Sequence, residues 1–144
     1  MTGILLEPTF AQNKWNRNLV WALSHILRGG MITIPVMYLR AALRGLCSVL
    51  YLNEPKLIVD ATWAIAYIAD DMGGGTQIDA VLETPLLLPR LMELLDDKDT
   101  MRAALRALGN LVAGGDNQTQ QVLDAGLLSN MVCCNKKVSN YQFE

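Results

Sequence analysis

One helical phrase recurs three times at a spacing of just over forty residues, and this periodicity constrains the fold more than any other feature. The copies place Trp21, Trp63 and Arg106 in register, 42 and 43 residues apart, within RNLVWALSHILRGG, DATWAIAYIADDMGG and AALRALGNLVAGG. Self-similarity at this period is typical of helical solenoids built from units of two or three helices. Because one unit cannot bury its apolar face alone, neighbouring units have to stack and share a core.

The copies also agree along a second stripe, which lies away from the leucine-rich side of each helix. Its members lie three or four residues apart, so that they share one helix face. They are Asn18, Trp21, His25 and Arg28; Asp60, Trp63, Tyr67 and Asp70; and Ala103, Arg106, Asn110 and Ala113. A large aromatic residue that recurs on the polar side of a helix is hard to explain by core packing. The stripe therefore predicts a binding surface that continues from unit to unit.

Apolar periodicity, interrupted by glycine and proline, predicts an all-α chain. The predicted helices cover about 16–28, 38–51, 56–70, 76–84, 86–95, 99–113 and 117–126. Residues 3–12 have the pattern of the end of an earlier helix, and 31–37 are expected to be irregular around a proline. From Leu127 the chain begins like another helix, and the polar NKKVSNYQFE is expected to end it. No segment alternates with the period of two that a strand requires.

The order of these helices predicts an armadillo architecture. Residues 76–115 form a short, a middle and a long helix followed by glycine, which is the layout of an armadillo repeat. We predict one armadillo-repeat domain over 1–144, a right-handed superhelical α-solenoid of about three repeats, with the third helices lining its concave groove. Its expected parts are a partial repeat at 1–30, repeats at 31–75 and 76–115, and a partial repeat with a divergent tail at 116–144.

The composition fits a packed helical protein. Of the 144 residues, 51% are apolar, which is enough for a core and argues against disorder. The formal net charge of -2 argues against general affinity for nucleic acid. No apolar run reaches the roughly 18 residues that a membrane helix needs, and MTGILLEPTF lacks the features of a secretory signal. We therefore expect neither nucleic acid nor a membrane as partner.

The reactive residues form no catalytic pattern. His25 is the only histidine, and no serine, aspartate or cysteine is placed to complete a triad with it. The three cysteines, two of them adjacent, fit neither a disulfide framework nor zinc-ligand spacing. The glycine run at 73–75 lacks the Lys-Ser or Lys-Thr pair of a phosphate loop, so we interpret it as a helix stop. The sequence predicts a protein that is not an enzyme, uses no metal or cofactor, and resides in a reducing compartment.

At this level the sequence resembles one family. RNLVWALSHILRGG, DATWAIAYIADD and ALRALGNLVAGGDNQTQQVLDAGLL resemble the fourth, fifth and sixth armadillo repeats of importin-alpha (karyopherin-alpha), the adaptor that recognises nuclear localisation signals. The resemblance covers roughly residues 10–128. It includes R-N-x-x-W-x-L-S, D-A-x-W-A-I-x-Y and A-L-R-A-x-G-N-x-V-x-G-x-D-x-Q-T-Q in the order and spacing of the family, and not only an apolar frame.

The resemblance implies a role for each stripe residue. The groove of the family carries a repeated W-x-x-x-N pair, in which Trp rings hold the methylene stem and ammonium of a lysine. The Asn one turn later binds the backbone of an extended peptide. By this resemblance the pairs here are Trp21 with His25 (in place of Asn), Trp63 with Tyr67, and Arg106 (in place of Trp) with Asn110.

Three charged residues adjust the expected specificity. Arg28 matches an Arg that the family carries after its fourth-repeat Trp, and Arg106 stands at the edge of the minor signal site. These two cations are expected to repel a lysine and to favour an acidic or neutral linker of a two-part signal. Asp60 shares a face with Trp63 and is expected to add negative potential. Two alternatives stay open, namely that the Trp rings pack between helices and that Asp60 is simply solvated.

The resemblance implies a nuclear import adaptor that binds lysine-rich signals of cargo proteins in an extended conformation and that occupies cytoplasm and nucleus. Importin-beta is a partner of the family, but these residues show no match to the basic arm that binds it. Few complete Trp–Asn pairs are present, so we expect weak affinity. The alternative is a truncated armadillo scaffold for protein–protein interaction without transport activity. The apolar, uncapped ends MTGILLEPTF and GLLSNMVCC predict marginal stability or self-association.

Overall fold

The computed structural model describes residues 14–28, 34–71 and 75–141, and all regular structure in these ranges is helical. The helices are α1 (Lys14–Arg28), α2 (Val36–Leu50), α3 (Pro55–Ala69), α4 (Thr76–Glu83), α5 (Leu87–Glu93), α6 (Met101–Val112), α7 (Asp116–Asp124) and α8 (Leu127–Tyr141), with a short 3-10 turn, η3, at Leu94–Asp96. The all-α prediction is confirmed. The predicted helix end at 3–12 lies outside the described residues.

The helix bounds agree with the predicted ones except at α8. The polar segment that was expected to end this helix continues it to Tyr141. Two contacts with the preceding unit explain the difference, because Lys137 forms a 2.7 Å ion pair with Asp96 and Cys134 is buried beside Met101. These partners lie more than thirty residues away in sequence. Tertiary packing therefore stabilises a helix that local sequence does not predict.

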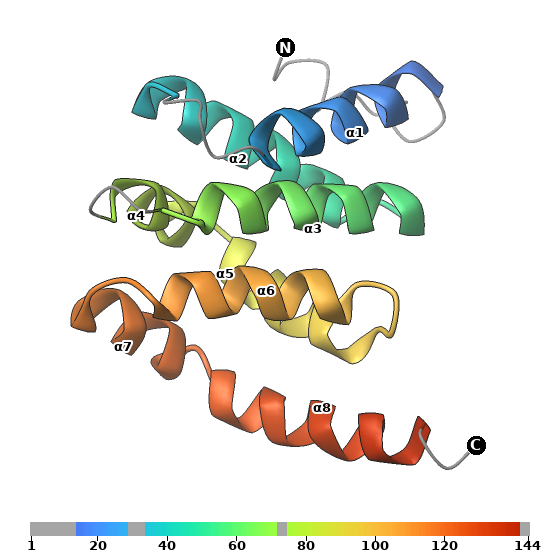
Figure 1. Cartoon of the computed structure of the whole chain (residues 1–144), viewed down its shortest axis with the longest axis vertical. Coiled ribbons are helices and arrows are strands. Elements are labelled where there is room, and N and C mark those ends of the chain that lie inside the picture. Colours follow the sequence, from blue (N-terminus) through green and yellow to red (C-terminus); the bar gives the residue numbers. More distant parts are fainter. Residues whose placement is uncertain (1–13, 29–33, 72–74, 142–144) are drawn as a thin grey trace.

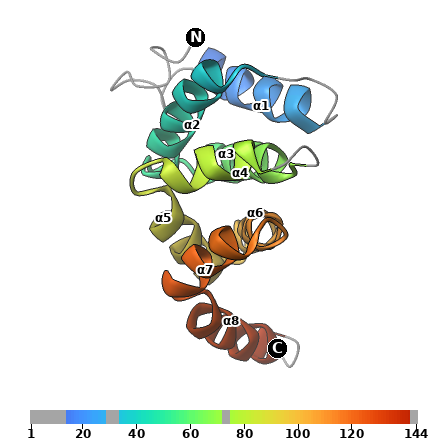
Figure 2. The same cartoon turned by 90° about the vertical axis from the view of Figure 1, so that its left-hand side faces the viewer.

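The long helices stack as a ladder. Figure 1 shows α1, α3 and α6 lying one above the other, and α3 packs against both of its neighbours. Figure 2 shows α2 and α5 on the opposite side of the same stack, with α2 packed against α3 and with α5 and η3 packed against α6. One side of the solenoid is thus formed by α1, α3 and α6, which we call the ladder side.

A single core runs through the whole stack. The buried cluster begins at Val20 in α1 and ends at Leu127 in α8, without separate cores for separate units. In the central helix α3 the four alanines at 61, 64, 66 and 69 are buried. Small side chains at these contacts let α1, α2 and α6 approach α3 closely. Shared burial of this kind makes neighbouring units depend on one another for stability.

A buried amide joins two consecutive first helices, α4 and α7. Gln118 donates from Nε2 to the carbonyl oxygen of Gly75 (3.0 Å) and to Oδ1 of Asp79 (2.7 Å). Its Oε1 accepts a hydrogen bond from the backbone N–H of Gly115 at 2.9 Å. Gly75 has φ of +89°, a conformation that favours glycine, and a Cβ there would lie 2.7 Å from Gln118 Nε2, so that the amide would have to shift.

Candidate functional site: the ladder-side groove

Two aromatic pairs mark the ladder side, one on α1 and one on α3. Trp21 is 53% exposed, and its ring centroid lies 4.2 Å from that of His25 in a tilted arrangement. Trp63 and Tyr67 are half-buried and stacked, with centroids 5.9 Å apart. Trp63 also packs against the core. Inter-helix packing is therefore part of the role of Trp63, whereas the Trp21 ring is largely open to solvent.

A hollow of about 490 Å³ lies between α3 and α6 and brings together three of the predicted residues. Its lining consists of Trp63, Arg102, Leu105, Arg106, Gly109 and Asn110. A Cβ added to Gly109 would meet no atom within 4 Å, so the surface of α6 is bare at this position. We call this hollow, together with the Trp21–His25 pair in the equivalent position on α1, the ladder-side groove.

Asn110 has a structural bond within this groove. Its Nδ2 donates to the carbonyl oxygen of Ala66 in α3 at 2.9 Å, and this oxygen also accepts the backbone N–H of Asp70. The bond fixes the plane of the amide and ties α6 to α3. One N–H and the Oδ1 atom are left over, and these are the donor and acceptor that an extended peptide backbone requires.

The groove contains cations without carboxylate partners. The ion pairs among the described residues are Arg40–Glu83, Arg90–Glu93 and Lys137–Asp96, and none of them involves Arg102 or Arg106. Both guanidinium groups are exposed. Arg28 is also exposed, in the last turn of α1, and it does not line the hollow.

Asp60 lies one turn before Trp63 and outside the hollow between α3 and α6. It is half-buried and borders a separate depression with Pro55, Lys56 and Asp99. Desolvation by burial raises the pKa of Asp60 above its ordinary value, and the charge of His25 in α1 partly opposes the shift. The Asp60 carboxyl therefore lies within electrostatic reach of His25 on α1.

The prediction of groove residues from the stripe was incomplete. Arg102, Leu105 and Gly109 line the hollow but do not belong to the predicted stripe, whereas Ala103 of that stripe is buried. The missed residues were accessible to sequence reasoning, because positions 102 and 109 lie four before and three after Arg106 on the same helix face.

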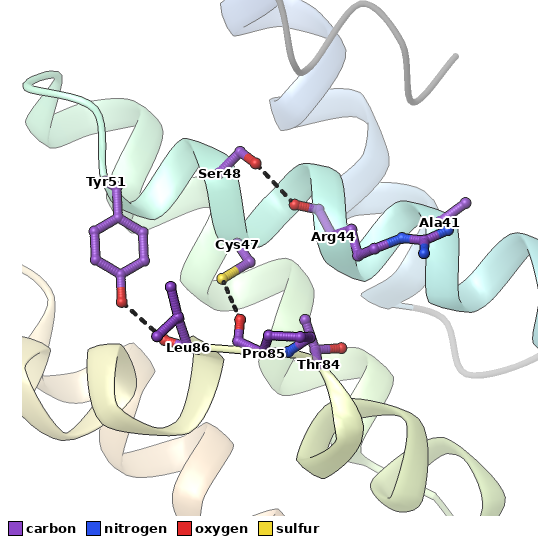
Figure 3. Close-up of a pocket in the computed structure, with 8 residues that line it drawn as sticks. All are labelled: Ala41, Arg44, Cys47, Ser48, Tyr51, Thr84, Pro85 and Leu86. Carbon is purple, nitrogen blue, oxygen red and sulfur yellow. Dashed lines mark hydrogen bonds between the residues drawn. The ribbon is translucent and has the colours of Figure 1, made fainter.

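A second hollow, of about 470 Å³, lies between α2 and the segment that joins α4 to α5 (Figure 3). Tyr51 donates from its hydroxyl to the carbonyl oxygen of Leu86 at 2.8 Å, and the Cys47 thiol contacts the carbonyl oxygen of Pro85 at 3.6 Å. Leu86 is exposed and has φ of +65°. Burial raises the pKa of the Cys47 thiol, which favours its protonated and less reactive form. None of the predicted site residues lies in this hollow.

The described residues contain no group of three or more histidine, cysteine, aspartate or glutamate residues that could hold a metal ion. None of the helices described is both long and apolar enough to cross a membrane.

Comparison with curated proteins finds relatives among importin-alpha subunits, although no protein-family model matches the chain. Importin subunit alpha-1a of Oryza sativa subsp. japonica is 37% identical over 110 residues, which are 75% of this chain and 20% of that protein. Importin subunit alpha-4 of Arabidopsis thaliana is 38% identical over 114 residues (74% and 20%). Importin subunit alpha-2 of Caenorhabditis elegans is 32% identical over 117 residues (81% and 22%). The chain thus spans about a fifth of the length of these relatives.

Solved structures give the same architecture. A designed armadillo repeat protein in complex with the peptide (KR)4 superposes with a TM-score of 0.73 at 27% identity, over 91% of this chain and 53% of that one. A second designed armadillo repeat protein gives a TM-score of 0.76 at 30% identity, with the same coverage. The armadillo prediction is confirmed. The chain is an armadillo-repeat α-solenoid related to part of the importin-alpha subunits.

Proposed function

We propose that the chain is an adaptor that binds lysine-rich nuclear localisation signals in extended form along the ladder-side groove, for import of cargo proteins into the nucleus. The observation that carries this proposal is the hollow in which Trp63 of α3 lies opposite Arg106 and Asn110 of α6. The names of the relatives and the basic peptide bound by the designed armadillo protein support the same function. On this proposal the chain is a binding protein and not an enzyme.

The groove chemistry suits a basic, extended peptide. Neighbouring helices pack about 8–10 Å apart, and an extended chain rises about 3.3 Å per residue. Adjacent ladder helices would therefore contact peptide side chains that lie two or three residues apart. The faces of Trp21 and Trp63 offer cation–π contact to a lysine ammonium and apolar contact to its methylene stem. The free N–H and Oδ1 of Asn110 pair with the peptide backbone.

The charges divide the groove into two parts. Asp60 and the aromatic pairs on α1 and α3 favour lysine, whereas Arg102 and Arg106 on α6 oppose it. A peptide that places a basic cluster along α1 and α3 and a neutral or acidic linker over α6 therefore fits best. His25 stands where the family carries Asn, with its ring tilted against Trp21, and this change removes one backbone clamp. Weak binding follows from this composition of the groove.

Fluorescence anisotropy with a labelled bipartite signal peptide tests the proposal. Loss of a cation–π contact of about 0.5–2 kcal/mol in Trp63→Ala should weaken binding about twofold to thirtyfold. Arg106→Glu should strengthen it, because a carboxylate replaces a cation beside the lysines. Tyr38→Ala, which removes an exposed aromatic residue of α2 outside the groove, is the matched control. An unchanged Kd in both groove variants would contradict the proposal.

The alternative is an armadillo scaffold without transport activity. Such a scaffold should be indifferent to free lysine-rich peptide, so the same titration separates the two. We further propose, from the resemblance alone, that the protein occupies cytoplasm and nucleus and that importin-beta is the partner of the family's full adaptor. Self-association through the ends of the solenoid is a separate proposal, which depends on the end faces and not on the groove.

A further inference from the structure

The first half of α6 carries two arginines, Arg102 and Arg106, which lie four residues apart and so share one helix face. Both are exposed, and both line the hollow between α6 and its neighbour α3 in the ladder (Figure 1). At the equivalent positions the other two ladder helices carry one tryptophan each and at most one cation, namely Arg17 and Trp21 in α1, and Val59 and Trp63 in α3. Two adjacent cations on the groove face are therefore particular to α6.

The stability of α6 does not explain this pair, because like charges four residues apart destabilise a helix. No carboxylate is among the described residues that line the hollow, and the ion pairs of the described residues involve neither Arg102 nor Arg106. Asp99, three residues before Arg102, borders the separate depression that Asp60 also borders. Two positive charges thus face the hollow without a counter-charge in its lining.

The next turn of α6 leaves room for a ligand beside these arginines. Asn110 is held by its bond to the carbonyl oxygen of Ala66, and its remaining amide hydrogen and oxygen suit a peptide backbone. Gly109 leaves the helix surface bare, since a Cβ there would meet no atom within 4 Å. A side chain of a peptide held at Asn110 can therefore lie along α6 toward Arg106.

We propose that Arg102 and Arg106 form an anion subsite of the ladder-side groove, which takes a phosphoserine or phosphothreonine from the linker of a bound signal. The subsite depends on the proposed function, because that function places the linker over α6. A guanidinium group presents its N–H donors in a planar fork that pairs with two phosphate oxygens. A phosphate monoester carries about -1.5 to -2 charges at pH 7 and three acceptor oxygens, so it can neutralise both arginines, whereas a carboxylate supplies one charge.

Without this subsite, phosphorylation should have the opposite effect on affinity. A phosphate lowers the positive charge of a lysine-rich peptide, and Asp60 beside the aromatic pairs favours positive charge. A groove that responded only to the net charge of the peptide would therefore bind the phosphorylated form less tightly. The sign of the change in Kd separates the two cases.

Fluorescence anisotropy of the 144-residue chain can measure this sign with bipartite peptides that differ at one linker residue, which is serine, glutamate or phosphoserine. Two exposed ion pairs should make the Kd of the phosphoserine peptide about threefold to thirtyfold lower than that of the serine peptide. The glutamate peptide should lie between them. Arg102→Gln and Arg106→Gln should each reduce the gain, and the double variant should abolish it.

Arg44→Gln is the matched control, because it makes the same change at an exposed arginine of α2 that lines the other hollow. This variant should keep the full gain. Each gain is a ratio of two Kd values on one variant, so a general effect of a substitution on affinity cancels, and circular dichroism verifies folding. A phosphoserine peptide that binds no better than the serine peptide overturns the subsite and leaves the proposed function standing, as does a gain that persists in the double variant.

A measurement without peptide keeps the two proposals separable. In nuclear magnetic resonance spectra of the chain, inorganic phosphate should shift the side-chain Nε–H signals of Arg102 and Arg106 and leave that of Arg44 in place. Equal shifts of all three signals, or no shift of any, overturn the subsite. If none of the peptides binds, the proposed function fails, and the phosphate titration still decides whether the two arginines form an anion site.

Discussion

The buried amide of Gln118 offers the most direct test of how consecutive units hold together. Gln118→Leu retains a similar volume and removes the hydrogen bonds to Gly75, Asp79 and Gly115. Asp79 and Gly115 are exposed and can bind water instead, and the buried carbonyl oxygen of Gly75 keeps the backbone N–H of Asp79 as a donor at 2.8 Å. No buried acceptor is left unsatisfied, and each of the three lost hydrogen bonds contributes about 0.5–1.5 kcal/mol. We expect a loss of about 1.5–4.5 kcal/mol in the free energy of unfolding.

Urea unfolding followed by circular dichroism measures this loss. Gln120→Leu is the matched control, because Gln120 lies on the same helix, is exposed, and donates only to Asp124 four residues later. An exposed i, i+4 bond contributes about 0.2–0.5 kcal/mol, so the control should change stability little. Equal effects of the two substitutions would refute the reasoning, since they would mean that the buried network contributes no more than a surface bond.

Three further substitutions test single features of the structure. Gly109→Ala should raise the free energy of unfolding by about 0.5–1 kcal/mol, since a Cβ there meets no neighbour within a helix; a melting temperature that falls would contradict the open geometry. Leu86→Gly should raise it by up to about 1 kcal/mol, because the leucine is exposed and has positive φ, as measured by thermal unfolding. Asp60→Asn tests pH dependence. Burial raises the folded pKa of Asp60 above its ordinary 3.8, so the aspartate contributes most stability below that pH and loses it as pH rises through the folded value. The free energy of unfolding of the asparagine variant should therefore rise relative to that of the parent chain between acidic and neutral pH. If the two free energies changed with pH in parallel, this reasoning would be refuted.

Local sequence signals were sufficient for most of the fold. Glycine and proline predicted the helix ends, and the 42–43-residue period predicted the stacking of α1, α3 and α6. Both signals can be read directly along the sequence. The predicted end of α8 was wrong, because the length of this helix depends on contacts with Asp96 and Met101 of the preceding unit. Such contacts become visible only when neighbouring helices are placed.

The groove was predictable as a stripe but not as a surface. Helical spacing placed Trp63, Arg106 and Asn110 on third helices, and the structure brings them together in one hollow. The bond from Asn110 to Ala66 crosses 44 residues and depends on the offset between α3 and α6, which no spacing along the chain reveals. The stripe also placed Ala103 at the surface, whereas the structure buries it.

Some residues that line the groove also hold neighbouring helices together, and this limits which substitutions can test peptide binding alone. Asn110 holds α6 to α3, and Trp63 packs on the core, so alanine at either position loosens the stack as well as the groove. Arg106 and Gly109 are both exposed and line the same hollow. Arg106 forms no ion pair among the described residues. A change in peptide affinity with Arg106→Glu, at unchanged stability, therefore reports on the groove alone. If affinity and stability changed together in this variant as well, the hollow would be part of the packing, and the peptide site would have to lie elsewhere on the solenoid.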